Sequence, residues 1–242
     1  MIPCTATAEE DNDDWMSPDR PGMATGVDVA PKGAVMLESG MEWGHDGTNQ
    51  ITLPCVMLRY GLTQFAELRV DWDGALTEGD NSKWKYNAAA LSIGTKVKVF
   101  DGWKWVPKTS LMANLAIPCT KAMKEEMHVA PSIYALFSND LTDWLNVGYN
   151  VGAEWNGISA TPATFVAVCL GASATDKLGV FLESYNYFVK EKHQSTDASW
   201  NLDFGLNYMI KPRLQLDLYS GFNLQHTKDG VFVGAGVAWR IR

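Results

Sequence analysis

The chain has 242 residues, a hydrophobic fraction of 46% and a formal net charge of −8. Its mean hydropathy is −0.13, and no stretch approaches the ~20 apolar residues that a membrane-spanning helix needs. The composition therefore excludes a helical membrane protein. The acidic balance also argues against a nucleic-acid partner, because phosphate contacts need clustered Lys and Arg.

The opening stretch, "MIPCTATAEEDNDDW", has neither a basic start nor an apolar core. It does not read as a signal peptide, and we expect that any such peptide has already been removed. The chain has four cysteines, and their spacing does not match a zinc site: Cys4, Cys55, Cys119 and Cys169. We expect free thiols, no metal and no cofactor.

Residues 1–33 are acidic and rich in Pro and Gly, and we expect them to form a periplasmic N-terminal tail. The stretch "DDWMSPDRPGMATGVDVAPKG" carries two turn signals of the Pro-Gly type. Three arrangements remain open, relative to the barrel that the following residues predict. The tail folds into that barrel as a plug, packs beneath it, or remains a disordered periplasmic leader.

From residue 34 onward, apolar and polar residues alternate almost without a break, which is the pattern of β-strands with one apolar face. The clearest case is "LNVGYNVGAEW" at 145–155, where the alternation is strict. We expect about twelve strands of roughly 8–12 residues, the length that a tilted membrane-crossing strand needs. The predicted strands cover residues 34–45, 55–62, 65–74, 90–100, 108–118, 131–138, 145–155, 164–173, 178–188, 198–209, 214–225 and 231–241.

The connections between these strands alternate in length. Five are tight turns and six are longer, more polar loops, including "GHDGTNQ" and "GALTEGDNSKWKYN". This is the up-and-down arrangement of an outer-membrane barrel. The sequence therefore predicts an all-β fold, an antiparallel up-and-down transmembrane β-barrel over residues 34–242. An even strand number places both termini on the short-turn, periplasmic side.

The charged residues within the strands decide which face lies inside. About twelve strands enclose a space too wide for apolar side chains to fill, so the apolar face should contact lipid and the charged face the lumen. Trp and Tyr near the strand ends on the apolar side fit interfacial girdles. The alternative is a soluble β-sandwich or barrel. The predicted lumen-lining residues are Glu38, Glu42, Arg59, Glu67, Arg69, Asp71, Lys96, Lys98, Glu154, Glu183, Asp203, Asp217 and Arg240.

Several stretches resemble a family of bacterial outer-membrane proteins. They are "GAVMLESGMEW", "TLPCVMLRYGLTQFAELRVDWDG", "LSIGTKVKVF", "TDKLGVFLESY" and "FVGAGVAWRI". The family is linked to transport and to the MetA pathway of phenol degradation, and is common in Bacteroidetes. The resemblance begins near Ser17 and covers nearly the whole remaining chain. It implies a bacterial outer-membrane β-barrel that passes small, aromatic or apolar compounds, and it supplies no catalytic motif.

The lumen charges allow two interpretations. They either set the charge pattern of a solute path, or pair across neighbouring strands and fill the lumen. Facing side chains on adjacent strands lie about 5 Å apart. On this basis Glu38, Glu67 and Asp71 should reach Arg59, Arg69 or Lys96. We expect a narrow, salt-bridged lumen that is acidic toward the outside and basic toward the periplasm.

The four histidines, His45, His128, His193 and His226, all fall in predicted long loops. Together with Asp71 and Asp73 they could form an acid/His site at the outer rim. Their spacing matches no metal-ligand motif, so we expect neither a metal site nor an enzyme.

Two function classes follow. The first is a channel or transporter for small solutes, with outer-membrane lipid and a small-molecule solute as partners. The second is a closed structural barrel that serves as a subunit of an outer-membrane complex and docks other envelope proteins.

Overall fold

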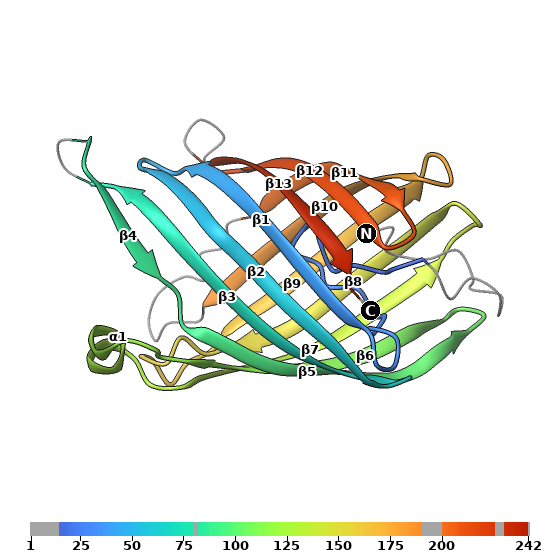
Figure 1. Cartoon of the computed structure of the whole chain (residues 1–242), viewed down its shortest axis with the longest axis horizontal. Coiled ribbons are helices and arrows are strands. Elements are labelled where there is room, and N and C mark those ends of the chain that lie inside the picture. Colours follow the sequence, from blue (N-terminus) through green and yellow to red (C-terminus); the bar gives the residue numbers. More distant parts are fainter. Residues whose placement is uncertain (1–14, 80–81, 190–199, 226–229, 242) are drawn as a thin grey trace.

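The structure, a computed structural model, describes residues 15–79, 82–189, 200–225 and 230–241. In this part of the chain, thirteen strands form one antiparallel sheet (Figure 1). The strands are β1 (Val35–His45), β2 (Asn49–Thr63), β3 (Ala66–Glu78), β4 (Trp84–Ala88), β5 (Leu91–Trp103), β6 (Val106–Ile117), β7 (Ala130–Asp140), β8 (Leu145–Glu154), β9 (Ala163–Ser173), β10 (Leu178–Val189), β11 (Asn201–Lys211), β12 (Leu214–Asn223) and β13 (Val231–Arg240).

Twelve of these strands close into a barrel. The last strand, β13, pairs with β1, and β2 pairs with β3, so every barrel strand has two neighbours. Closure satisfies the backbone groups that an open sheet edge would leave bare in lipid. The predicted all-β, up-and-down barrel of about twelve strands is confirmed.

One strand was not predicted. We expected the whole stretch between the third and fourth barrel strands to be a loop, but β3 continues to Glu78 and β4 pairs with its upper half, Gly74–Glu78. The short strand β4 therefore extends the wall beyond the point where β3 pairs with β5, which ends at Asp71 and Ser92. It stands out at the long-loop end of the barrel (Figure 1).

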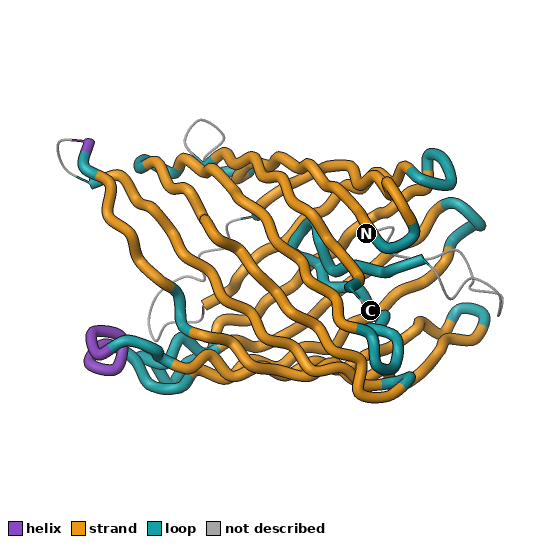
Figure 2. Tube along the Cα trace, viewed as in Figure 1, coloured by secondary structure: helices purple, strands orange, loops and turns teal. Residues whose placement is uncertain are grey.

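The connections are short at one end and mostly longer at the other (Figure 2). We call these the short-turn end and the long-loop end. The predicted long loop between β1 and β2 is wrong, because both strands run to His45 and Asn49 and leave only residues 46–48 between them. The connection from β6 to β7 contains a helix, α1 (Lys121–Glu126). No helix in the described ranges is long and apolar enough to cross a membrane.

The two faces of the wall differ as the alternation predicted. In β8, Val151 is 45% exposed, whereas Asn146 and Asn150 are 5% exposed. In β12, Leu216 is likewise 45% exposed, while its neighbour Asp217 is 4% exposed. A continuous apolar outer surface of this kind is far larger than soluble proteins tolerate. The outer face is built for lipid.

The interior of the barrel contains residues 15–34, which we call the N-terminal segment. It enters the lumen as an irregular chain and then continues directly into β1 (Figures 1 and 2). The small apolar clusters inside the barrel include its side chains, such as Met16 against Met36 and Met209, and Val27 against Leu136.

Candidate functional site: the filled lumen

Wall carboxylates bind the amide groups of the N-terminal segment. Glu38 accepts hydrogen bonds from the backbone N–H groups of Asp19 (3.1 Å) and Arg20 (2.9 Å). Glu67 accepts one from the N–H of Ala30 at 2.5 Å. An irregular chain inside a barrel has no ladder partner for these groups, and an unpaired buried N–H costs free energy. The wall side chains provide the missing partners.

The same arrangement recurs on the opposite side of the lumen. Glu183 accepts hydrogen bonds from the N–H groups of Met23 (2.7 Å) and Ala24 (2.8 Å). Asn150 binds both backbone groups of Thr25, accepting from its N–H at 2.7 Å and donating to its carbonyl at 3.1 Å. Four strands, β1, β3, β8 and β10, therefore hold the segment by its amides.

Wall cations and hydroxyls bind the carbonyl groups of the segment. Lys96 donates to the carbonyl oxygens of Gly26 (3.0 Å) and Asp28 (2.7 Å). Arg59 donates to those of Ser17 (3.0 Å) and Asp28 (3.1 Å). The hydroxyl of Ser110 and the amide of Gln215 provide two further bonds, to the carbonyls of Val27 (2.6 Å) and Arg20 (3.2 Å).

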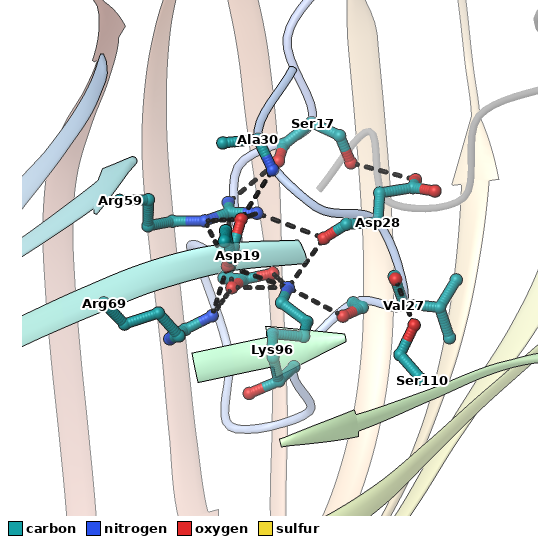
Figure 3. Close-up of polar contacts among 12 residues, drawn as sticks. Ser17, Asp19, Val27, Asp28, Ala30, Arg59, Arg69, Lys96 and Ser110 are labelled. Carbon is teal, nitrogen blue, oxygen red and sulfur yellow. Dashed lines mark hydrogen bonds and ion pairs between the residues drawn. The ribbon is translucent and has the colours of Figure 1, made fainter. Parts of the chain in front are cut away.

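A group of ion pairs surrounds the side chain of Asp19, as Figure 3 shows. Its carboxylate lies 2.9 Å from Lys96 Nζ and 3.6 Å from Arg59, and it also contacts Arg69. Glu67 pairs with Arg59 at 2.9 Å and with Arg69 at 3.2 Å. We call three cations and three carboxylates the central cluster: Arg59, Arg69, Lys96, Asp19, Glu38 and Glu67.

The central cluster is almost completely buried. Arg59, Glu67 and Lys96 are 0% exposed, and Asp19 is 7% exposed. Burial alone would raise the pKa of the Asp19 carboxyl, but the charges of Arg59, Lys96 and Arg69 outweigh it and hold that pKa well below its usual range. Asp19 is therefore a carboxylate at neutral pH and, with Glu38 and Glu67, balances the three wall cations.

A second ion pair ties the segment to β12. Arg20 donates to Asp217 at 3.0 Å and lies over the Tyr219 ring, 5.8 Å from its centroid. Burial would lower the pKa of the Arg20 guanidinium, but its hydrogen bond and charge pairing with Asp217 raise the pKa above its usual value. The segment is thus charge-matched to the wall at two separate points.

The segment leaves the lumen along β2. The N–H of Gly33 donates to the carbonyl of Gly61 at 2.8 Å, and the N–H of Gly61 donates to that of Ala34 at 3.0 Å. A Cβ on Gly61 would collide with the carbonyl oxygen of Pro31. Only glycine permits this close approach, so Gly61 fixes the point where the segment joins the wall.

The structure places the thirteen predicted lumen residues on the face opposite the exposed apolar one. Nine are buried: Glu38, Arg59, Glu67, Arg69, Lys96, Glu183, Asp203, Asp217 and Arg240. Four are half-buried: Glu42, Asp71, Lys98 and Glu154. Among the residues that the structure describes, Asp71 forms no ion pair, whereas Lys98 pairs with Asp101 at 2.5 Å.

Two cavities flank the N-terminal segment. The outer cavity, at the long-loop end, has a volume of about 390 Å³, and its lining includes Glu42, Tyr185, Asn201 and Phe232. The inner cavity, at the short-turn end, has a volume of about 370 Å³, and its lining includes Lys32, Arg213 and Arg240. The outer cavity is acidic and aromatic, and the inner one is basic.

The histidines do not come together in the described part of the chain. His45 ends β1 and contacts Asn49 through Nδ1 at 3.0 Å. His128 follows α1 at the end of a different loop. His193 and His226 lie outside the described residues. Over the described ranges, no group of His, Cys, Asp or Glu could hold a metal ion.

The sequence interpretation missed Asp19 and Arg20, two charged residues of the segment whose side chains form ion pairs with the wall. One signal in the sequence could have revealed these residues: the predicted wall has an excess of cations near the short-turn end. Such cations need carboxylates from another part of the chain. Alternation could not find these residues, because the segment is not a strand.

A closed barrel with an apolar outer face and a charged interior is an outer-membrane β-barrel. The chain belongs to the family described as "Putative MetA-pathway of phenol degradation", which matches residues 18–241. No curated protein matches the sequence.

Two solved structures share the fold. An outer-membrane channel from Pseudomonas putida F1 superposes with a TM-score of 0.67 at 11% identity, covering 92% of this chain and 99% of that one. The translocator domain of the autotransporter NalP from Neisseria meningitidis gives a TM-score of 0.53 at 10% identity, covering 89% and 91%.

Proposed function

We propose that this protein is an outer-membrane channel for small solutes, and that the N-terminal segment and the central cluster close its lumen at rest. One observation carries the proposal: the wall presents hydrogen-bonding side chains to both the amides and the carbonyls of the segment. A lumen that only needed filling could use apolar side chains from the wall. A segment that lies inside the barrel and is held by hydrogen bonds to its backbone can close the lumen and can also be released.

The solutes are small aromatic or apolar compounds. The family description, which refers to phenol degradation, supports this class. The rings of Tyr185 and Phe232 in the lining of the outer cavity support it as well, since aromatic rings pack against one another favourably. The protein catalyses no reaction in this proposal, and the charged lumen residues control passage.

A second function rests on the same observation. A barrel whose interior is filled and salt-bridged also suits a closed structural subunit that docks other envelope proteins. In that case the segment would stabilise the barrel permanently and no substitution in the central cluster would create a path.

Single-channel conductance in planar bilayers separates the two. We expect a small conductance for the wild-type protein and a larger one for Arg69→Ala, because this change removes contacts to Asp19 and Glu67. Lys177→Ala, in an exposed turn between β9 and β10, is the matched control and should behave like wild type. A folded Arg69→Ala barrel with unchanged conductance would favour the structural subunit. A large, open wild-type conductance would rule out the closed lumen.

A further inference from the structure

Asp203 is a carboxylate that neither the wall nor the segment satisfies. It lies on the lumen face of β11 and is 1% exposed. Neither of its carboxylate oxygens has a hydrogen-bond partner among the described residues. A buried charge without a partner is among the costliest features a fold can contain, so its presence calls for a neutralising group.

The nearest wall positions do not supply that group. Across the ladders, Asp203 faces Glu183 on β10 and Gly221 on β12. Like charges directly opposite each other destabilise a sheet, and the Glu183 oxygens are already engaged by the amides of Met23 and Ala24. On the other side, Gly221 has no side chain, and the ring of Phe232 lies against it.

The cations of the lumen are committed elsewhere. Arg20 binds Asp217, and the three cations of the central cluster bind Asp19, Glu38 and Glu67. Asp203 and Glu42 therefore have no ion-pair partner among the described residues.

The outer cavity adjoins Asp203. Asn201, in its lining, precedes Asp203 by one inward position on β11, and Tyr185 lies opposite Asn201 on β10. Glu42, on the far side of the lining, accepts a hydrogen bond from the Tyr219 hydroxyl at 2.9 Å. A ligand in this cavity would meet the carboxylate of Glu42 and the rings of Tyr185 and Phe232. Asp203 lies one inward position along β11 from the lining residue Asn201.

We propose that Asp203, together with Glu42 and the ring of Tyr185, binds the ammonium group of a small organic cation that enters from the outer cavity. A carboxylate neutralises an ammonium group, and tyrosine rings attract it through their π faces. No group in the described ranges has the ligands for a metal ion, which favours a singly charged organic cation. The site adds a cationic solute class to the small aromatic or apolar compounds proposed above, and it depends on the channel proposal only for transport.

Binding tests the inference without requiring an open channel. We would titrate the purified full-length barrel in detergent with benzylammonium and with benzyl alcohol, a neutral compound of nearly the same shape, by calorimetry at pH 7. We expect saturable binding of benzylammonium only. Asp203→Asn, which keeps the side-chain shape, should weaken it at least about tenfold, because it removes the negative charge that pairs with the ammonium group.

Asp140→Asn, at the opposite end of the barrel, removes a carboxylate that pairs with Lys108 and should leave binding unchanged. Glu42→Gln should weaken binding independently if Asp203→Asn does not fold. Equal binding of benzylammonium and benzyl alcohol to the wild type would overturn the inference and leave Asp203 neutralised by a proton. Displacement of benzylammonium by K⁺, with K⁺ binding lost in Asp203→Asn, would overturn it in favour of an inorganic ion. Either result leaves the Arg69→Ala conductance test of the channel untouched.

Discussion

Replacing Asp19 by asparagine should release the N-terminal segment. The substitution keeps the size of the side chain but leaves Arg59, Arg69 and Lys96 with only Glu38 and Glu67 as counter-charges. Removing one partner from a buried ion-pair group costs about 3–5 kcal/mol. That free energy penalises the docked state alone, because water solvates the cations once the segment has left. The ratio of released to docked segment should rise roughly 150- to 5,000-fold.

The open probability of single channels in planar bilayers measures this shift. Asp28→Asn is the matched control, because Asp28 lies in the same segment but its side chain, among the described residues, accepts a single hydrogen bond, from Ser17 at 3.2 Å. We expect frequent openings for Asp19→Asn and wild-type behaviour for Asp28→Asn. If both variants opened equally, or if neither did, the ion pairs of Asp19 would not hold the segment in place.

Three further predictions concern pH, the lipid face and the lumen face. The contribution of Asp19 to docking should be constant from neutral pH down to about 4, which is the ordinary pKa of a free aspartate. It should weaken only below that pH, because the pKa of Asp19 is lowered in the docked state. Recording channel opening as a function of pH measures this contribution, and loss of closure at pH 6 would contradict the prediction. Leu216→Arg lies on the exposed face of β12 and should destabilise the barrel by roughly 2–4 kcal/mol, the cost of an arginine at mid-membrane. Urea unfolding in vesicles measures this change in stability. A change near zero would place Leu216 outside the lipid. In a cysteine-free background, a membrane-impermeant maleimide should label Glu154→Cys and should not label Val151→Cys. It should label Asn150→Cys only in a protein that also carries Asp19→Asn. Equal labelling of all three cysteines would contradict the assignment of faces.

The barrel could be predicted because its information is local. In a strand such as 145–155, the side-chain period of two assigns each residue to one face, and the charged residues then identify the lumen. The ion pair of Glu67 with Arg59 was likewise within reach, because both residues occupy neighbouring strands of the predicted order.

The rest depends on contacts that alternation does not encode. Asp19 reaches Lys96 across 77 residues of sequence, from a segment without regular structure. The strand β4 forms because β3 is longer than predicted. The additional residues at the end of β3 pair with β4 at the long-loop end of the barrel. Asp203 was predicted to face the lumen, but alternation carries no information on whether its oxygens have partners there, and among the described residues they have none.

The path of the N-terminal segment has a consequence for biogenesis. Its contacts join residues that are very distant along the chain, 197 positions apart for Arg20 and Asp217 and 160 for Met23 and Glu183. Contacts of such long range form late and slowly. The N-terminal segment is synthesised before the strands that it binds, but it is thus among the last parts to reach its final place, after the final strands have been made. We therefore expect an assembly intermediate in which the barrel strands have paired and closed around a hydrated interior. The N-terminal segment then enters the lumen from the periplasm and completes the fold.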